Sequence, residues 1–459
     1  MRCARSTPCT ASASIPWSAG CSRGPRCPTK CCCAATRRSG RVPSVWAKRR
    51  SGGKPTSGSC GPWKTRRSIA GSSPMIYLDN AATTPVDPRV AEVMAATQRT
   101  YPGNPSSLHA AGRAARAALE DARAQVAALL GTEPETVVFT SGGTEANTLA
   151  LLGVFEALPP GSHHLVTSEI EHPSVLAPAA RLERQGVRVT RLRPGPEGWI
   201  DPDTLARALR PDTRLVSLMA ANNVTGVVQP LDALAKITQA RGILLHTDAV
   251  QAVGKIPLDL QRLPIDLLSL SGHKLHGPKG VGALIVRSGV RLAPQMLGGG
   301  QERGLRSGTE NTPALVGLGL AAALAHREGP DDAVRLVALR EHLLEGLETR
   351  VPQVYVIGDR WRRLPGHLCL GFAGQEGEAI KVLLALDEAG IAASSGSACS
   401  AQRAAEPSAI LSAMGFDPLK ARGALRLTLG RFTSAAEIER VLSVLPSVVQ
   451  TLRPLTSGV

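Results

Sequence analysis

The sequence has no apolar run that approaches the ~18 residues of a membrane-spanning helix. Its first 74 residues contain no aspartate or glutamate, although they carry 15 lysines and arginines. After residue 74 only two cysteines occur, Cys369 and Cys399, which excludes a disulfide framework in that part. No internal repeat of ~20–50 residues is visible, which excludes the common repeat architectures. These absences favour a reduced, cytoplasmic protein without a membrane segment.

The formal net charge of +16 belongs to the N-terminal end of the chain. Because residues 1–74 supply nearly all of that charge, residues 75–459 are close to neutral. They therefore lack the overall basic character of a nucleic-acid-binding domain. A length of 459 residues with 43% hydrophobic residues predicts two or three domains with a large buried core.

Residues 1–74 are rich in Arg, Ser, Pro, Gly and Cys, without helical or strand periodicity. They could be a targeting peptide, a basic nucleic-acid-binding arm or a metal-binding segment. The metal interpretation is weak, because paired Cys-x-x-Cys spacing is missing and no histidine precedes His109. We favour a disordered or mis-assigned N-terminal extension, since ordered patterning begins abruptly at Met75. An intact mass that includes residues 1–74 would contradict a mis-assigned start.

Helical and strand patterns alternate from residue 89. Helices are expected at 89–100, 110–130, 144–158, 205–209 and 231–241, and strands at 136–140, 164–167, 215–219, 243–247 and 280–286. This alternation predicts an α/β domain with a mostly parallel sheet over residues 89–325. The later pattern has helices at 333–349 and 378–388, strands at 354–357, 368–372 and 424–429, and a terminal helix. It predicts a smaller α+β domain, formed by residues 75–88 and 326–459.

Polar residues follow several of these strands, at the edge where open α/β sheets bind ligands. Lys274 comes after an apolar run and is flanked by small residues. Such a lysine can lose solvation, have its pKa lowered and form a Schiff base. Pyridoxal phosphate (PLP) enzymes use a lysine in this way and pair it with an acid on the ring nitrogen. The alternative is an ordinary solvated lysine.

The other strand ends also allow two interpretations each. The glycine-rich residues 141–147 could bring backbone N–H groups to a phosphate, or form an ordinary turn capped by Thr144. Asp248 could hold a protonated ring nitrogen or cap a helix. His172 could stack on a ring or lie on the surface, and Asn223 could belong to a turn. The order of these groups along the chain favours a PLP site.

Several ordered motifs in residues 75–459 resemble fold-type-I PLP enzymes of aminotransferase class V, most closely the cysteine desulfurases of the NifS/IscS kind. The motifs lie at 77–85, 103–107, 140–147, 171–174, 221–223, 247–251, 271–274, 298–309, 394–400 and 426–430. The resemblance implies a large PLP-binding domain with a mostly parallel, seven-stranded sheet and a smaller α+β domain. It also implies a homodimer.

The resemblance implies a role for each matching residue. Lys274 would attach the cofactor and shuttle a proton, Asp248 would hold the pyridinium nitrogen, and Gln251 would hold the phenolic oxygen. His172 would stack over the ring. The groups implied for phosphate binding are Thr144, Ser271, His273 and, from a second subunit, Thr309.

The resemblance also implies how substrate is held. Asn223, next to the cofactor, and Arg426 would bind the substrate carboxylate, for which a guanidinium is well suited. One residue departs from the family pattern, because Val224 stands where the family usually has glutamate. If that acid positions Asn223, turnover could be lower here.

Cys399 distinguishes a desulfurase from other members of the class. It lies among Ser, Gly and Ala in residues 394–400, which is typical of a mobile loop. A buried packing cysteine is the alternative, and we assign that role to Cys369 instead. A thiolate on such a loop could take sulfur from PLP-bound L-cysteine, leaving a persulfide and alanine.

The expected function is therefore sulfur supply to an acceptor protein, either an iron–sulfur scaffold or a tRNA-thiolation carrier. Selenocysteine lyase or another class V aminotransferase activity is the enzymatic alternative. A non-enzymatic alternative is nucleic-acid binding through residues 1–74. We expect no metal site, no membrane contact and no direct nucleic-acid contact by the rest of the chain.

Overall fold

The computed structural model describes residues 75–395 and 406–452. The expectations for residues 1–74 and for Cys399 lie outside the described residues. No helix in the described part is long and apolar enough to cross a membrane.

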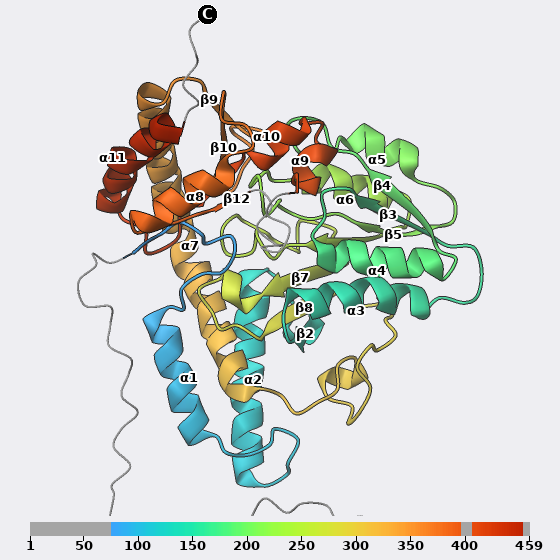
Figure 1. Ribbon diagram of the computed structural model, residues 1–459. Helices are drawn as coiled ribbons and strands as arrows, with labels where there is room; N and C mark the ends of the chain where they lie inside the picture. The colour runs from blue at the N-terminus through green and yellow to red at the C-terminus, as the bar shows by residue number, and fades with distance from the viewer. Residues whose placement is uncertain (1–74, 396–405, 453–459) are drawn as a thin grey trace, which may run out of the picture. The chain divides into compact units, whose positions relative to one another are not determined.

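A seven-stranded sheet forms the centre of the larger part of the structure (Figure 1). Its strand order is β2 (Val137–Thr140), β8 (Gly282–Val286), β7 (Leu267–Ser271), β6 (Leu244–Asp248), β5 (Thr213–Ser217), β3 (His164–Ser168) and β4 (Arg188–Leu192). β8 is antiparallel to both of its neighbours, and the remaining pairs are parallel. The expected mostly parallel, seven-stranded sheet is confirmed.

Alternate strand residues enter two cores, one on each face of this sheet. On one face, Val138 and Leu267 pack against α3 (Gly143–Glu156) and α4 (Pro173–Arg184). On the other face, Val137 and Leu268 belong to a core built with five further helices. These helices are α1 (Pro88–Thr100), α2 (Ala110–Leu129), α5 (Pro202–Ala208), α6 (Leu231–Ala240) and the first half of α7 (Thr312–Arg350). α1 (Pro88–Thr100) and α2 lie beside α7 (Figure 1).

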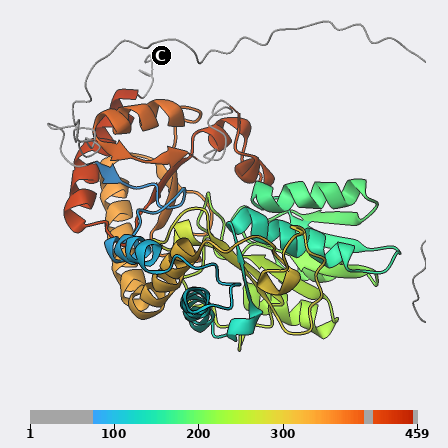
Figure 2. The same ribbon diagram turned by 90° about the horizontal axis from the view of Figure 1, so that it is seen from below.

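A second, four-stranded antiparallel sheet lies to one side of the seven-stranded sheet (Figure 2). Its order is β12 (Ser394–Ser395), β13 (Leu425–Thr428), β10 (His367–Phe372) and β9 (Val354–Val356). Its core includes the second half of α7, α8 (Ala379–Glu388) and α11 (Ala435–Leu452). The first described strand, β1 (Ile76–Tyr77), pairs with β11 (Ile391–Ala392), so β1 lies against this part. The short helices α9 (Ala409–Ala413) and α10 (Pro418–Arg422) precede β13.

Helix α7 differs from its expected extent of 333–349. It is a single helix of 39 residues that begins at Thr312 and contains Pro330. A proline removes one helical hydrogen bond and interrupts the pattern, so the sequence indicates only the second half. Because α7 contributes to both cores, the domain boundary predicted near residue 325 falls inside it, and the division into two domains stays a prediction.

Helix α4 and strand β4 were not predicted. α4 begins with Pro173 at its first turn, where proline is well tolerated, but it also contains Pro178. The second proline hides the helical pattern of this segment. Its N-terminus is where His172 lies, so the missed helix matters for the site.

Candidate functional site

The polar strand ends converge on one cavity of about 260 Å³ at the carboxyl edge of the seven-stranded sheet. Nine of the predicted site residues line it: Thr144, His172, Asn223, Asp248, Gln251, Ser271, His273, Lys274 and Arg426. The sheet explains this convergence, because β3, β5, β6 and β7 are parallel and end at the same edge. Arg426 comes instead from β13 of the smaller sheet.

Lys274 is held at the cavity by the chain segment that follows β1. It ends a short 3-10 helix (Gly272–Lys274) directly after β7, and its side chain is buried. Its Nζ donates hydrogen bonds to the carbonyl oxygens of Ala81 and Ala82, the latter at 2.8 Å. The amine is therefore aimed at the cavity by two backbone groups.

Asp248 and His172 are joined by a chain of hydrogen bonds. Asn147, in the first turns of α3, donates from Nδ2 to Asp248 Oδ2 at 2.7 Å and to Ser174 Oγ at 2.8 Å. Ser174 in turn contacts His172 Nδ1, with its backbone N–H donating at 3.1 Å and its Oγ 2.7 Å away. Because Nδ1 accepts the backbone N–H, a neutral His172 carries its proton on Nε2.

Burial controls the protonation of both groups. It raises the pKa of Asp248, although the hydrogen bonds from Val250 and Asn147 and the charges of His172 and Lys274 act to lower it. It lowers the pKa of His172, and the charge of Lys274 lowers it further. A buried carboxylate of this kind is stabilised by a cation in the cavity, such as a protonated ring nitrogen.

The turn between β2 and α3 forms another wall of the cavity. Gly142 has φ of 152°, a conformation that side chains disfavour. A Cβ on Gly143 would lie 2.6 Å from Val250 Cγ2, so only glycine fits there. The turn places the N-terminus of α3 next to Ser271, where backbone N–H groups and the helix dipole favour a phosphate.

Arg426 and Asn223 form the side nearest the smaller sheet. Arg426 is fully buried, and its guanidinium donates to Asn223 O at 2.8 Å and to Asp79 Oδ1 at 2.7 Å. Within residues 75–395 and 406–452, Arg426 Nε and Asn223 Oδ1 are buried and have no hydrogen-bond partner. Since buried polar atoms are nearly always paired, these two atoms fit a ligand that supplies a partner.

Two predicted site residues are not placed in this cavity. Cys399 lies outside the described residues, and Thr309 is exposed and does not line the cavity of its own chain. Cys369 is buried in an apolar cluster, where burial raises the pKa of its thiol to about 12. Val224 belongs to the same apolar cluster and is also buried.

Sequence reasoning missed Asn147, Ser174 and the carbonyls of Ala81 and Ala82. Asn147 follows Thr144 by three residues, which places both on one face of α3, so helical spacing could have indicated it. Nothing in the sequence indicates the carbonyl contacts, since they depend on how the segment after β1 crosses the sheet edge.

The chain belongs to the aminotransferase class-V family, whose model matches residues 76–441. This is a family of PLP enzymes, in agreement with the cavity described above.

Individual relatives indicate which enzymes of this class the chain is similar to. A cysteine desulfurase of Cereibacter sphaeroides is 50% identical over 383 residues, covering 83% of this chain and 97% of the relative. The cysteine desulfurase IscS of Dictyoglomus turgidum is 44% identical over 381 residues, covering 83% and 96%. Among solved structures, a NifS-like protein is similar with a TM-score of 0.77 and 36% identity, covering 82% of this chain and all of that one.

Proposed function

We propose that this protein is a PLP-dependent cysteine desulfurase that converts L-cysteine to L-alanine and leaves the sulfur as a persulfide on Cys399. The convergence of Lys274, Asp248 and His172 on one cavity, from three different strand ends, carries this proposal. The names of the relatives, at 44% and 50% identity over nearly their whole length, support it.

The residues present fit the cofactor. Asp248 would stabilise the ring nitrogen, His172 would cover the ring face, and Gln251 would donate to the phenolic oxygen. Thr144, Ser271, His273 and the N-terminus of α3 would bind the phosphate. When bound, PLP supplies an electron sink for breaking bonds at the substrate amino acid.

Lys274 has two tasks in this proposal. It would attach the cofactor through Nζ, and after substrate replaces it, Nζ would accept the proton from the substrate Cα. The carbonyls of Ala81 and Ala82 hold the unmodified amine of Lys274 at the cavity. The same Nζ would also return the proton, so this step would need no second lysine.

Substrate binding would use the buried polar atoms next to β13. Arg426 and Asn223 both line the cavity, and within the described part of the chain Arg426 Nε and Asn223 Oδ1 have no hydrogen-bond partner. An arginine that is already fixed by Asp79 can bind a carboxylate with little loss of side-chain freedom.

Sulfur transfer would involve Cys399. Its thiolate would attack the substrate sulfur, so that an S–S bond forms while the C–S bond breaks. The electron pair of the broken bond stays on the substrate carbon, which takes up a proton and becomes the methyl group of alanine. The persulfide then goes to an acceptor protein, an iron–sulfur scaffold or a tRNA-thiolation carrier. We also propose a cytoplasmic homodimer, with the partner subunit's Thr309 at the phosphate.

The test is to give purified protein L-cysteine and measure alanine together with a persulfide by mass spectrometry. Cys399→Ala is expected to abolish both products, because the sulfur has no acceptor. Cys369→Ala is the matched control and is expected to keep activity, since Cys369 is buried and holds its thiol proton. Alanine production that survives in Cys399→Ala would point to another class V activity and contradict the proposal.

A further inference from the structure

Lys255 is a partly buried lysine that none of the roles above uses. It lies four residues after Gln251, and its Nζ is 3.3 Å from Gln251 Oε1. Among the residues that the structure describes, Gln251 is its only polar partner, and no carboxylate pairs with it. A partly buried lysine without an acid loses part of its hydration, so its position requires an explanation.

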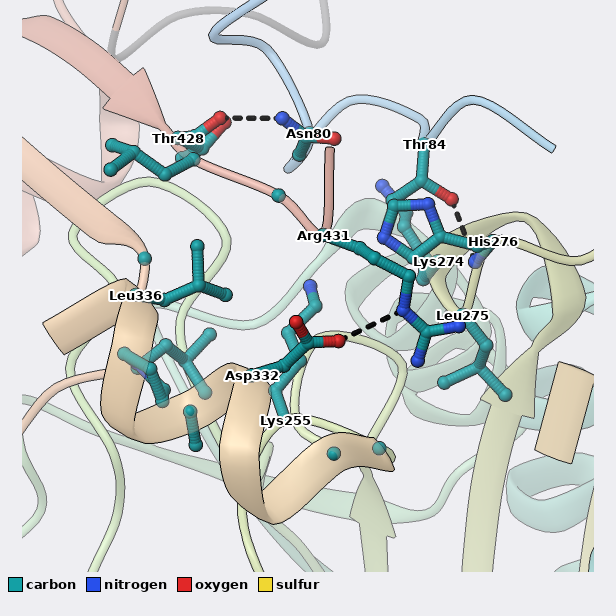
Figure 3. A pocket seen from close by; sticks show the side chains of 18 of the residues that line it. Asn80, Thr84, Lys255, Lys274, Leu275, His276, Asp332, Leu336, Thr428 and Arg431 are labelled. Atoms are coloured by element: carbon teal, nitrogen blue, oxygen red, sulfur yellow. Dashed lines mark hydrogen bonds and ion pairs between the residues drawn. The ribbon is translucent and has the colours of Figure 1, made fainter. Parts of the chain in front are cut away.

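Lys255 lies where two further cavities meet. One, of about 60 Å³, is also lined by Lys274, and Figure 3 shows both lysines reaching into it near His276 and the ion pair of Arg431 with Asp332. The other is a cleft of about 610 Å³ beside α7. Burial, with the charges of Lys274 and Arg426, lowers the pKa of Lys255 to about 7. Charged or neutral, its amine keeps N–H groups and can donate to Gln251.

Two contacts fix how the Gln251 amide is oriented, and Lys255 makes one of them. The amide oxygen accepts from Lys255, so its NH2 group faces the other way and donates to Ala81 O at 2.9 Å. The same Ala81 carbonyl accepts from Lys274 Nζ. A glutamine amide rotated by 180° would present its oxygen to that carbonyl and to the cavity, which is repulsive.

We propose that Lys255 is a positioning residue, which holds the Gln251 amide with its NH2 group toward the cofactor cavity. The inference rests on the proposed function in one respect, that this cavity binds PLP. Gln251 can donate to the cofactor's phenolic oxygen only in this orientation. Lys255 therefore supports a cofactor contact without touching the cofactor.

The test is a double-mutant cycle on cofactor binding, measured by titrating the apoprotein with PLP. Lys255→Met and Gln251→Leu are each expected to raise the Kd about fivefold, the loss of about one hydrogen bond. The double variant is expected to bind no more weakly than Gln251→Leu. The visible absorbance band of loaded Lys255→Met should also move toward that of Gln251→Leu.

Two further variants separate positioning from other effects. Lys255→Arg keeps a donor and is expected to retain the affinity of the wild type. Lys236→Met removes an exposed lysine charge on α6, outside the residues that line the cofactor cavity, and should leave the Kd unchanged. The proposal would be wrong if Lys255→Met raised the Kd for PLP by the same factor in the wild type and in Gln251→Leu. It would also be wrong if Lys255→Met left the Kd unchanged. The titration requires no turnover, so it tests the role of Lys255 even if no alanine is formed. A wild-type protein that does not bind PLP would contradict both this inference and the proposed function.

Discussion

The carboxyl group of Glu171, next to His172, keeps its proton at neutral pH. Burial raises its pKa from the ordinary 4.5 to about 8, despite hydrogen bonds from Ser168 Oγ at 2.6 Å and Met219 N–H at 3.1 Å. Both bonds reach Oε1, and Oε2 has no partner among the described residues. The proton therefore belongs on Oε2, and Glu171 acts as a neutral spacer between β3 and the loop after β5.

Glu171→Gln should change how stability depends on pH. Between about pH 4.5 and 8 the folded protein binds more protons here than the unfolded chain, so this contribution is complete below pH 4.5 and falls as pH rises toward 8. Relative to Glu171→Gln, the free energy of unfolding of the wild type should fall by up to about 1.4 kcal/mol per pH unit. Chemical denaturation at several pH values measures this slope.

The control for this measurement is Glu183→Gln. Glu183 is exposed, and its ion pair with Arg191 lowers its pKa below 4.5. That variant should therefore show no such slope between pH 5 and 8. If the difference in unfolding free energy between the wild type and Glu171→Gln were also independent of pH, Glu171 would be ionised in the folded protein.

Residue types at strand ends could be predicted from the sequence, but their partners could not. Lys274, Asp248 and His172 were recognisable because each follows an apolar strand and has a side chain suited to cofactor chemistry. Asn147, Ser174 and Lys255 act by hydrogen bonding to those residues or to Gln251. Such contacts depend on distances of a few tenths of an ångström, which no sequence pattern specifies.

At the scale of elements, the turn from β2 to α3 depends on glycine at two positions for different reasons. A Cβ on Gly143 would meet a side-chain methyl group of Val250, at 2.6 Å. A Cβ on Gly282, in the neighbouring strand β8, would meet backbone, 2.5 Å from Leu270 O and 2.7 Å from Gly142 Cα. Side chains can be shortened and backbone cannot, so the two glycines should differ in their response to a second mutation.

Gly143→Ala is expected to displace this turn and raise the Kd for PLP about tenfold, which corresponds to ~1.4 kcal/mol. Val250→Ala removes the clashing methyl group and should restore most of the affinity. Gly282→Ala should lower the melting temperature, and Val250→Ala should not rescue it. PLP titration and thermal unfolding measure these effects. If Val250→Ala rescued both glycine variants, or neither of them, this account would be wrong.

Several helices without an internal proline were predicted within a few residues, whereas α4 was missed and only the second half of α7 was expected. The expected helix at 231–241 is observed at Leu231–Ala240. In α4 and α7, Pro178 and Pro330 replace hydrogen-bonding residues inside the helix. Packing of both helices against their cores compensates for the missing bonds, and that compensation is a property of the assembled fold.

On the scale of the whole molecule, an apolar cluster connects segments that are far apart in the sequence. It contains Ile170 and Val224 from the larger part, and Ile357, Cys369 and Leu411 from the smaller part. Val224 is 2% exposed there, and its carbonyl accepts a hydrogen bond from His367 at 2.9 Å. The valine that departs from the family pattern is thus part of the packing between the two parts.

Restoring the acid with Val224→Glu should therefore destabilise the molecule. A carboxyl group in this cluster loses water without gaining an apolar contact, which is expected to cost at least about 2 kcal/mol. Leu419→Glu, at a position that is 52% exposed, is the control and should leave the melting temperature nearly unchanged. If Val224→Glu were as stable as the wild type and turned over faster, the valine would be a catalytic deficiency instead.

Helix α7 limits how this protein can exchange parts with its relatives by recombination. A crossover at residue 325 would join the first half of one α7 to the second half of another, while each half packs in a different core. In such a chimera, the second half of α7 would come from one protein and would continue a first half from another protein, with which it did not evolve. Crossovers before Thr312, which keep α7 whole, would instead place the mismatch where α7 meets α1 and α2. Chimeras of this family should therefore need matched surfaces along α7 wherever they are joined.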